Sequence, residues 1–412
     1  MPTPAVLGQG FRPFFLAATV AAIVDIALWL AMLHGYWPWP HHLGGVGWHA
    51  HEMLFGYFAA VMAGFLLTAA HNWTGVATPT GAALAALLAL WLAGRVAPWL
   101  DGPPLLAAAL DLAFLPALAV ALRGALWHGP NRANRAFVAL LAAMTLAGAM
   151  AHLGALGWLA GGETRGHRLM LDLGVVLLVL ISARVMPFFI ERGLAGARAR
   201  TWPALERALP ALGLALALTD LIAPLGVLAG ALAIALGGAL LVRLAGWHDQ
   251  RLWRTPLLAV LYVGLLWLAL GLMLDGLSAL GVLAPRGALH ALTIGAIGVV
   301  TLGMMARVTL GHSARPMRAG PATLVAFALI NLAALARGLG PVVLPEGYRL
   351  WLVVGGACWI GAFALFLWVH APMLVRPRAD GLMSCRDGAR AEPPRQPSAG
   401  ARAAPLTPGT SA

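Results

Sequence analysis

Long apolar segments alternate with short polar connections over most of the chain. A helix that spans a bilayer needs about 20 mostly apolar residues, and twelve segments meet this requirement. The predicted spans are 12–33, 50–71, 80–98, 104–122, 134–156, 167–190, 203–222, 224–244, 255–281, 288–310, 321–341 and 348–374. The pattern therefore predicts an all-α, polytopic membrane bundle of about twelve transmembrane helices, with one transmembrane domain over residues 1–375.

The composition agrees with a membrane protein. The chain is 61% hydrophobic and 10% charged, whereas a soluble domain averages about 45–50% apolar and about 25% charged residues. This difference excludes an ordinary soluble enzyme and a disordered protein.

Residues 376–412 depart from the pattern, because Pro, Arg, Ser and Gly dominate there. Their composition predicts a disordered cytoplasmic tail. The two distant cysteines, Cys358 and Cys385, form neither a disulfide framework nor a zinc site.

The basic residues indicate how the chain is oriented. All 27 are arginine, and the net charge is +12. They stand between the apolar segments, so the charge reports membrane topology and predicts no nucleic-acid partner. With the N-terminus in the cytoplasm, thirteen arginines fall in inner connections and six in outer connections before the tail. This excess, together with the even number of spans, predicts that both termini are cytoplasmic.

Histidines open three of the predicted spans near the outer face. His51, His167 and His290 begin spans two, six and ten, at intervals of 116 and 123 residues. Two of them are followed by identical residues at +5, +10 and +13, namely Gly56, Val61 and Gly64, and Gly295, Val300 and Gly303. The identities fit either three pseudo-repeats of four helices or coincidence in a biased chain. A real repeat predicts that the three histidines share one depth.

Imidazole is a ligand for copper, iron and zinc, and the commonest axial ligand of haem iron. His49 and His51 point about 200° apart on a continuous helix, so they share a metal only if His49 lies in the helix cap. A solvated interfacial pair is the alternative. His51 paired with His290 would give bis-imidazole ligation of haem, and a hydrogen-bonded structural role is the alternative for His290. His167 is a candidate third ligand or copper ligand.

A second group of candidates lies at the inner face. His312 is about 33 Å from His290 along a straight helix, at ~1.5 Å per residue, so the two cannot share a centre. Arg12, Arg184 and Arg307 fall at the same level as His312. Arginine pairs well with carboxylates such as haem propionates, whereas the alternative reading of these arginines is the inner-face excess of positive charge.

Other ionisable residues suggest a different class of function. Asp25, Asp111 and Asp275 lie within predicted spans, where a transporter uses such groups for coupling and where polar pairing between helices is the alternative. His152 is predicted to lie near the interface. The remaining histidines lie in loops or at span edges and are predicted to have surface roles; apart from His71, they are His34, His41, His42, His128, His248 and His370.

Several motifs resemble those of the NnrS family over residues 10 to about 375. They include Gly10-Phe11-Arg12-Pro13-Phe14-Phe15, Trp48-His49-Ala50-His51-Glu52-Met53, Arg184-Val185-Met186-Pro187-Phe188-Phe189, His290-Ala291-Leu292-Thr293 and Leu310-Gly311-His312. The resemblance implies a polytopic bacterial inner-membrane protein that contains haem and copper and acts in nitric oxide metabolism and nitrosative stress. By matching motif, it implies His49, His51, His290 and His312 as ligands, with Arg12 and Arg184 as motif residues.

The leading hypothesis is therefore a haem- and copper-binding membrane protein whose metal lies near the outer face and meets nitric oxide or related nitrogen oxides, with a redox partner. The rivals are a proton- or ion-coupled transporter of a small solute or metal, and a haem sensor or assembly protein without turnover. A weaker likeness is to haem–copper oxidase catalytic subunits. The span at 203–222 has no histidine, so the oxidase copper site is incomplete and oxygen reduction is not predicted.

Overall fold

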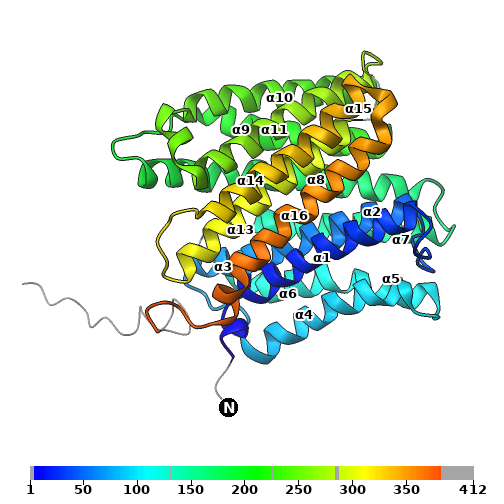
Figure 1. The fold of residues 1–412 in the computed structure, drawn as a ribbon, viewed down its shortest axis with the longest axis horizontal. Helices are drawn as coiled ribbons and strands as arrows, with labels where there is room; N and C mark the ends of the chain where they lie inside the picture. Colours follow the sequence, from blue (N-terminus) through cyan, green and yellow to red (C-terminus); the bar gives the residue numbers. More distant parts are fainter. Residues whose placement is uncertain (1–3, 130, 225, 284–286, 382–412) are drawn as a thin grey trace, which may run out of the picture.

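The computed structural model describes residues 4–129, 131–224, 226–283 and 287–381, and these residues contain helices and no strand. The helices run side by side as one bundle (Figure 1). Their bounds are α1 Phe11–Leu33, α2 Val46–His51, α3 Ala59–Thr74, α4 Gly81–Val96, α5 Pro104–Leu112, α6 Phe114–Leu126, α7 Arg135–Ala155, α8 Gly162–Gly193, α9 Pro203–Ile222, α10 Val227–Trp247, α11 Pro256–Ala279, α12 Ala288–His290, α13 Val299–His312, α14 Pro321–Ala334, α15 Gly340–Val343 and α16 Tyr348–Val375.

Eleven helical stretches of the described chain are long and apolar enough to cross a membrane. The remaining predicted span, 203–222, is α9, which is also a helix but carries Glu206, Arg207 and Asp220 within its 20 residues. The prediction of an all-α polytopic membrane bundle is confirmed. The predicted tail begins with described residues up to Gly381, and its remainder, 382–412, lies outside the described residues.

Three of the spans contain a π-helical segment. Glu52–Phe58 joins α2 to α3, Ala291–Gly298 joins α12 to α13, and Leu335–Leu339 joins α14 to α15. The first two begin directly after His51 and His290, so the segments that share identical residues at +5, +10 and +13 also share this backbone irregularity. Short π-segments inside α-helices are rare, and those that occur are often found at functional sites.

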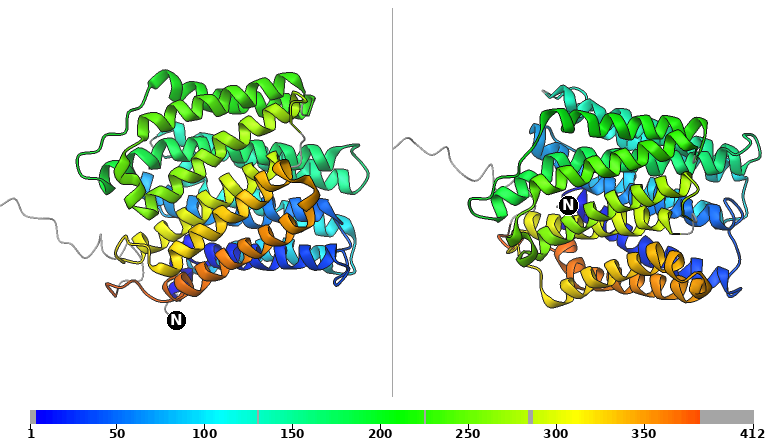
Figure 2. Two further views of the ribbon diagram at one scale, coloured as in Figure 1. Left: turned by 45° about the horizontal axis from the view of Figure 1, so that its top comes forward. Right: turned by 90° about the horizontal axis from the view of Figure 1, so that it is seen from above.

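Neighbouring helices of the chain pack side by side: α6 packs against α7, and α10 packs against α11. The last helix, α16, returns to pack against α1, and Figure 1 and Figure 2 show these two helices next to each other. The three spans that begin near His51, His167 and His290 meet near the middle of the bundle. The close approach is visible at Gly174 of α8, where an added Cβ would lie 3.0 Å from Phe58 and 3.9 Å from Ile297. The pseudo-threefold symmetry itself stays a prediction.

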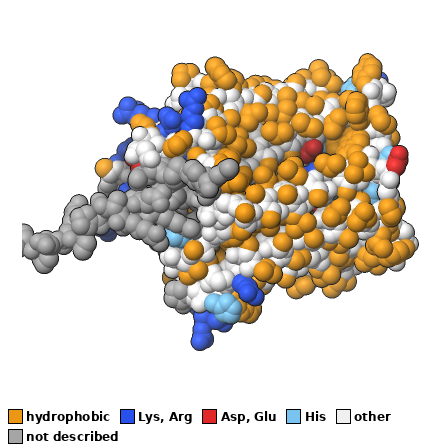
Figure 3. All heavy atoms as spheres, turned by 90° about the horizontal axis from the view of Figure 1, so that it is seen from below, with side chains coloured by type: hydrophobic (Ala, Val, Ile, Leu, Met, Phe, Trp, Pro, Cys, Tyr) orange, Lys and Arg blue, Asp and Glu red, His pale blue; other side chains and the backbone are white. Residues whose placement is uncertain are grey.

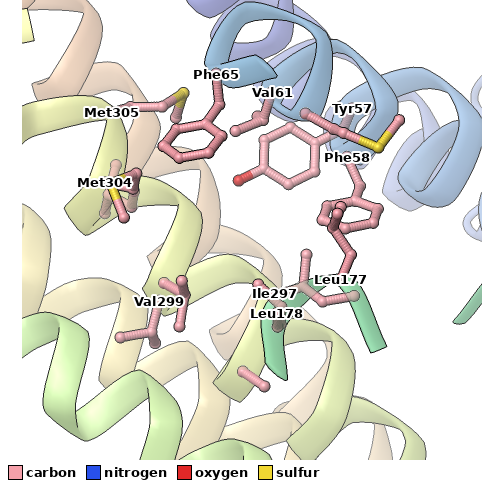
Figure 4. Close-up of a cluster of buried hydrophobic side chains, with 14 of the residues drawn as sticks. Tyr57, Phe58, Val61, Phe65, Leu177, Leu178, Ile297, Val299, Met304 and Met305 are labelled. Carbon is pink, nitrogen blue, oxygen red and sulfur yellow. The ribbon is translucent and has the colours of Figure 1, made fainter. Parts of the chain in front are cut away.

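Apolar side chains fill the space where these three helices meet. Figure 4 shows Tyr57, Phe58, Leu177 and Ile297 pointing toward one another, and all four are buried. The Tyr57 hydroxyl of this group lies 2.5 Å from the Thr301 hydroxyl. This apolar plug stands between the end of the bundle that holds His51 and the end that holds His312.

The outer surface is suited to lipid. Large apolar side chains are exposed around the bundle, among them Ile222, Leu218 and Trp368. Figure 3 shows a broad hydrophobic band on one face, with arginines gathered at one end of it. The protein is therefore a multi-pass membrane protein whose two ends differ in charge.

The orientation can be read with reporter fusions. A fusion at Gly44, in the connection before α2, should report the outside, and a fusion at Gly193, the last residue of α8, should report the cytoplasm, because the arginine excess is retained on the cytoplasmic side. Reporter activity and membrane abundance are measured together. Both fusions on one side, or the two sides exchanged, would contradict the prediction.

Candidate metal centre

Asp111 lies at the centre of a buried cluster at the end of the bundle opposite His312. Its Oδ2 atom lies 2.9 Å from Nε2 of His51 and 2.8 Å from Nε2 of His152, while Oδ1 pairs with Arg95. His51, Asp111 and His152 are all buried, and one ligand atom of each lies within 4.8 Å of the others. Three helices therefore bring a carboxylate and two imidazoles together away from water.

The backbone around Asp111 is interrupted for a local reason. α5 ends at Leu112 and α6 begins at Phe114, so the predicted fourth span is two helices. Pro116 has no backbone N–H, and its ring crowds the carbonyl of Leu112, four residues earlier. The break falls at Ala113, two residues after Asp111.

His42 extends the cluster from the connection before α2. Its Nε2 atom lies 3.0 Å from Nδ1 of His152, and the two rings stack with centroids 5.2 Å apart. The prediction of surface roles for His42 and His370 is wrong, because both are buried, and His152 is buried as well. Burial and the neighbouring His152 lower the pKa of His42 to about 4, so His42 is neutral at physiological pH.

Arg95 of α4 joins this cluster to the π-segment that follows His51. Its guanidinium donates to Glu52 at 2.7 Å and also pairs with Asp111. Both carboxylates are buried. The positive charge therefore stabilises two acidic side chains on either side of His51.

Two histidine nitrogens in this region are buried without a hydrogen-bond partner among the described residues, namely Nδ1 of His51 and Nε2 of His167. The two rings lie 5.6 Å apart, from centroid to centroid. Buried polar atoms nearly always have a partner. These two nitrogens are thus exceptions to that rule in the described part of the chain.

A second group of histidines lies on the other side of α2. His49 is inside that helix, not in its cap, so it points away from His51, and its ring stacks on Trp29 with centroids 4.4 Å apart. His290 of α12 accepts from Arg337 at 3.1 Å. The Nδ1 atoms of His49 and His290 are again buried and without a partner in the described chain, and the two rings lie within electrostatic range of each other.

At the arginine-rich end, His312 and Arg12 lie beside the end of α16. Arg12 is fully buried, and its Nη1 donates to the carbonyls of Met373, Leu374 and Arg376 at 3.2, 3.0 and 2.6 Å. The His312 ring lies 5.6 Å from the Phe11 ring. Arg12 thus caps the last turn of α16, where a cation stabilises the carbonyl end of the helix.

The other two arginine candidates contact aromatic rings. Arg184 donates to the Asn134 side chain at 2.6 Å and lies 4.9 Å from the centroid of Trp73. Arg307 lies 3.9 Å from the centroid of Phe189. Such cation–π contacts are favourable away from water, so both arginines have partners that account for their positions.

The family model described as NnrS protein matches residues 5–378. The chain belongs to the NnrS family. No curated protein matches it. Membership confirms the recognition that rested on the sequence motifs.

The NnrS motifs supply much of the two histidine groups. The motif Trp48-His49-Ala50-His51-Glu52-Met53 forms most of α2 and the start of its π-segment, and it points one histidine to each group. The motif that begins at His290 opens the second π-segment. Asp111, His152 and His42 lie outside the quoted NnrS motifs, and the structure adds them to the site.

Proposed function

We propose that this NnrS-family chain is a haem- and copper-binding protein of the bacterial inner membrane that acts in nitric oxide metabolism and the nitrosative-stress response. The observation that carries the proposal is the set of buried imidazole nitrogens without a partner in the described chain, on His49, His51 and His167. Copper and iron both accept imidazole ligands. The family membership supports the biological process.

The first group of histidines fits a copper ion. Two imidazoles that share one ion with metal–nitrogen bonds of about 2 Å need ring centres about 5–6 Å apart, and those of His51 and His167 are 5.6 Å apart. Asp111 accepts from Nε2 of His51, which leaves Nδ1 of His51 free. A carboxylate that holds the other nitrogen is the usual support of a metal-binding histidine.

Asp111 itself is better suited to support than to ligation. Its second oxygen pairs with the guanidinium of Arg95. The positive charge of this guanidinium repels a metal cation and so disfavours metal binding to the same carboxylate. His152 and His42 extend the hydrogen-bonded chain away from His51. These residues orient the ligands and exclude water.

The second group fits haem iron. His49 would provide Nδ1, and His290 would provide Nε2, the nitrogen that accepts from Arg337 in the structure. Arg337, released from that hydrogen bond, would provide a cation that can pair with a propionate. The bound metals would supply reversible binding of nitrogen oxides and electron exchange with them. The chain's own residues hold the imidazoles in orientation and keep both centres apart from the arginine-rich end through the apolar plug.

The test is the composition of the purified protein. Protein from cells supplied with haem precursors and copper should show haem absorption in the visible spectrum and contain copper by elemental analysis. Colourless, copper-free protein that is still folded by circular dichroism would contradict the proposal and favour a transporter.

A further inference from the structure

Arg168 of α8 holds three aspartates from three helices. Its guanidinium contacts Asp220 of α9 at 2.6 and 2.8 Å, and Asp275 of α11 at 2.5 and 3.1 Å. The third aspartate, Asp172, lies one turn further along α8, with Oδ1 3.4 Å from Nε of Arg168. These four are the charged groups that the described residues bring to this point.

The cluster is buried and its charges do not balance. The side chains of Arg168, Asp172, Asp220 and Asp275 are 12, 2, 0 and 7% exposed. Arginine does not lose its proton in proteins, so three ionised aspartates would leave two negative charges uncompensated among membrane-spanning helices. Uncompensated charge in such surroundings is costly, and an aspartate that keeps its proton reduces the uncompensated charge from two to one.

Asp172 differs from the other two aspartates because one of its carboxylate oxygens has no hydrogen-bond partner in the described chain. This oxygen, Oδ2, is buried. Asp220 and Asp275 receive short charge-assisted bonds from Arg168, which favour their ionised forms. Asp172 is the most distant of the three from the guanidinium and so gains least from being ionised.

We infer that Arg168, Asp172, Asp220 and Asp275 form a proton-binding site within the membrane, in which Asp172 carries the proton at neutral pH. A metal cation is not the ligand of this site, because the guanidinium already occupies the position between the carboxylates. The inference does not depend on the proposed haem and copper centres. The site stands next to them, since Arg168 directly follows His167 on α8.

Infrared spectroscopy tests the inference directly, because a protonated carboxyl has a C=O stretching band that a carboxylate lacks. The wild-type protein in lipid bilayers should show this band at neutral pH, and the difference spectrum between wild type and Asp172→Asn should contain the part of the band that Asp172 contributes. Asp172→Glu keeps the carboxyl and should move the band to another frequency. Glu206→Gln is the matched control, because Glu206 pairs one-to-one with Arg243 at 2.5 Å and is expected to be ionised.

Thermal stability gives a second readout that separates the aspartates. Asp172→Asn resembles the neutral acid and should leave the melting temperature unchanged or raised, whereas Asp275→Asn loses a paired carboxylate and should lower it. A wild-type spectrum without the band, or a band that both Asp172 variants leave in place, would overturn the inference. So would a band that disappears with Asp275→Asn and not with Asp172→Asn.

Discussion

Replacing His51 or His167 with alanine should abolish copper binding and leave the haem spectrum in place. Replacing His290 or His49 should have the opposite effect, because α2 points its two histidines to different groups. Each variant removes a ring nitrogen that the bound metal requires. Copper by elemental analysis and haem by its visible spectrum are measured on the same preparation, each divided by the amount of folded protein.

Two histidines serve as matched controls for these variants. His128 is exposed in the connection between α6 and α7, and His312 lies at the far end of the bundle. His128→Ala and His312→Ala should therefore keep both metals. If His51→Ala loses copper and haem together, the two groups form one shared centre. If His312→Ala loses haem while His290→Ala keeps it, the centre belongs at the arginine-rich end, with Arg12, Arg184 and Arg307 as propionate partners.

Eleven of the twelve predicted spans are helices long and apolar enough to cross a membrane, and they could be predicted because this depends on a local property. Each apolar segment must be about 20 residues long to cross a bilayer, and this requirement can be read directly from the sequence. The ends of the helices were less predictable. Span six is predicted from His167, whereas α8 begins at Gly162, since polar residues extend the helix beyond the apolar part. His167 therefore lies inside the helix and not at its start.

The cluster around Asp111 depends on contacts between distant parts of the chain. Asp111 is 60 residues from His51 and 41 from His152, and no spacing rule joins them. The one available signal was an ionisable group inside an apolar segment, which indicates a buried partner without identifying it. His42 gave no such signal, because a histidine in a short connection usually faces solvent.

Arg168 shows that counting arginines in the sequence does not identify which of them are buried. In sequence it is one of the outer arginines, yet its guanidinium is paired inside the bundle with Asp220 and Asp275. An arginine near a span edge can thus belong to topology or to a buried ionic cluster. The distinction requires the positions of the aspartates, which lie 52 and 107 residues away.

Substituting Asp111 tests whether the carboxylate positions the copper ligands. Asp111→Asn keeps the shape of the side chain but removes the charge that faces Arg95 and one of the oxygens that accept hydrogen bonds. Loss of such a supporting carboxylate typically weakens metal binding about 10–100-fold. We expect the copper dissociation constant to rise by about this factor, and the electron paramagnetic resonance spectrum of bound Cu²⁺ to change as the His51 ring reorients.

The matched control is Asp249→Asn, which removes a carboxylate from an exposed pair with Arg251. Hydrogen bonds from Arg251 lower the pKa of Asp249 to about 2, so this control also deletes a negative charge at neutral pH, but in a connection that holds none of the candidate copper ligands. Asp111→Glu should restore part of the affinity, since it restores the acceptor and the charge. A purely structural role for Asp111 predicts a different result: the melting temperature falls, while the copper affinity and spectrum of the protein that remains folded stay at their wild-type values.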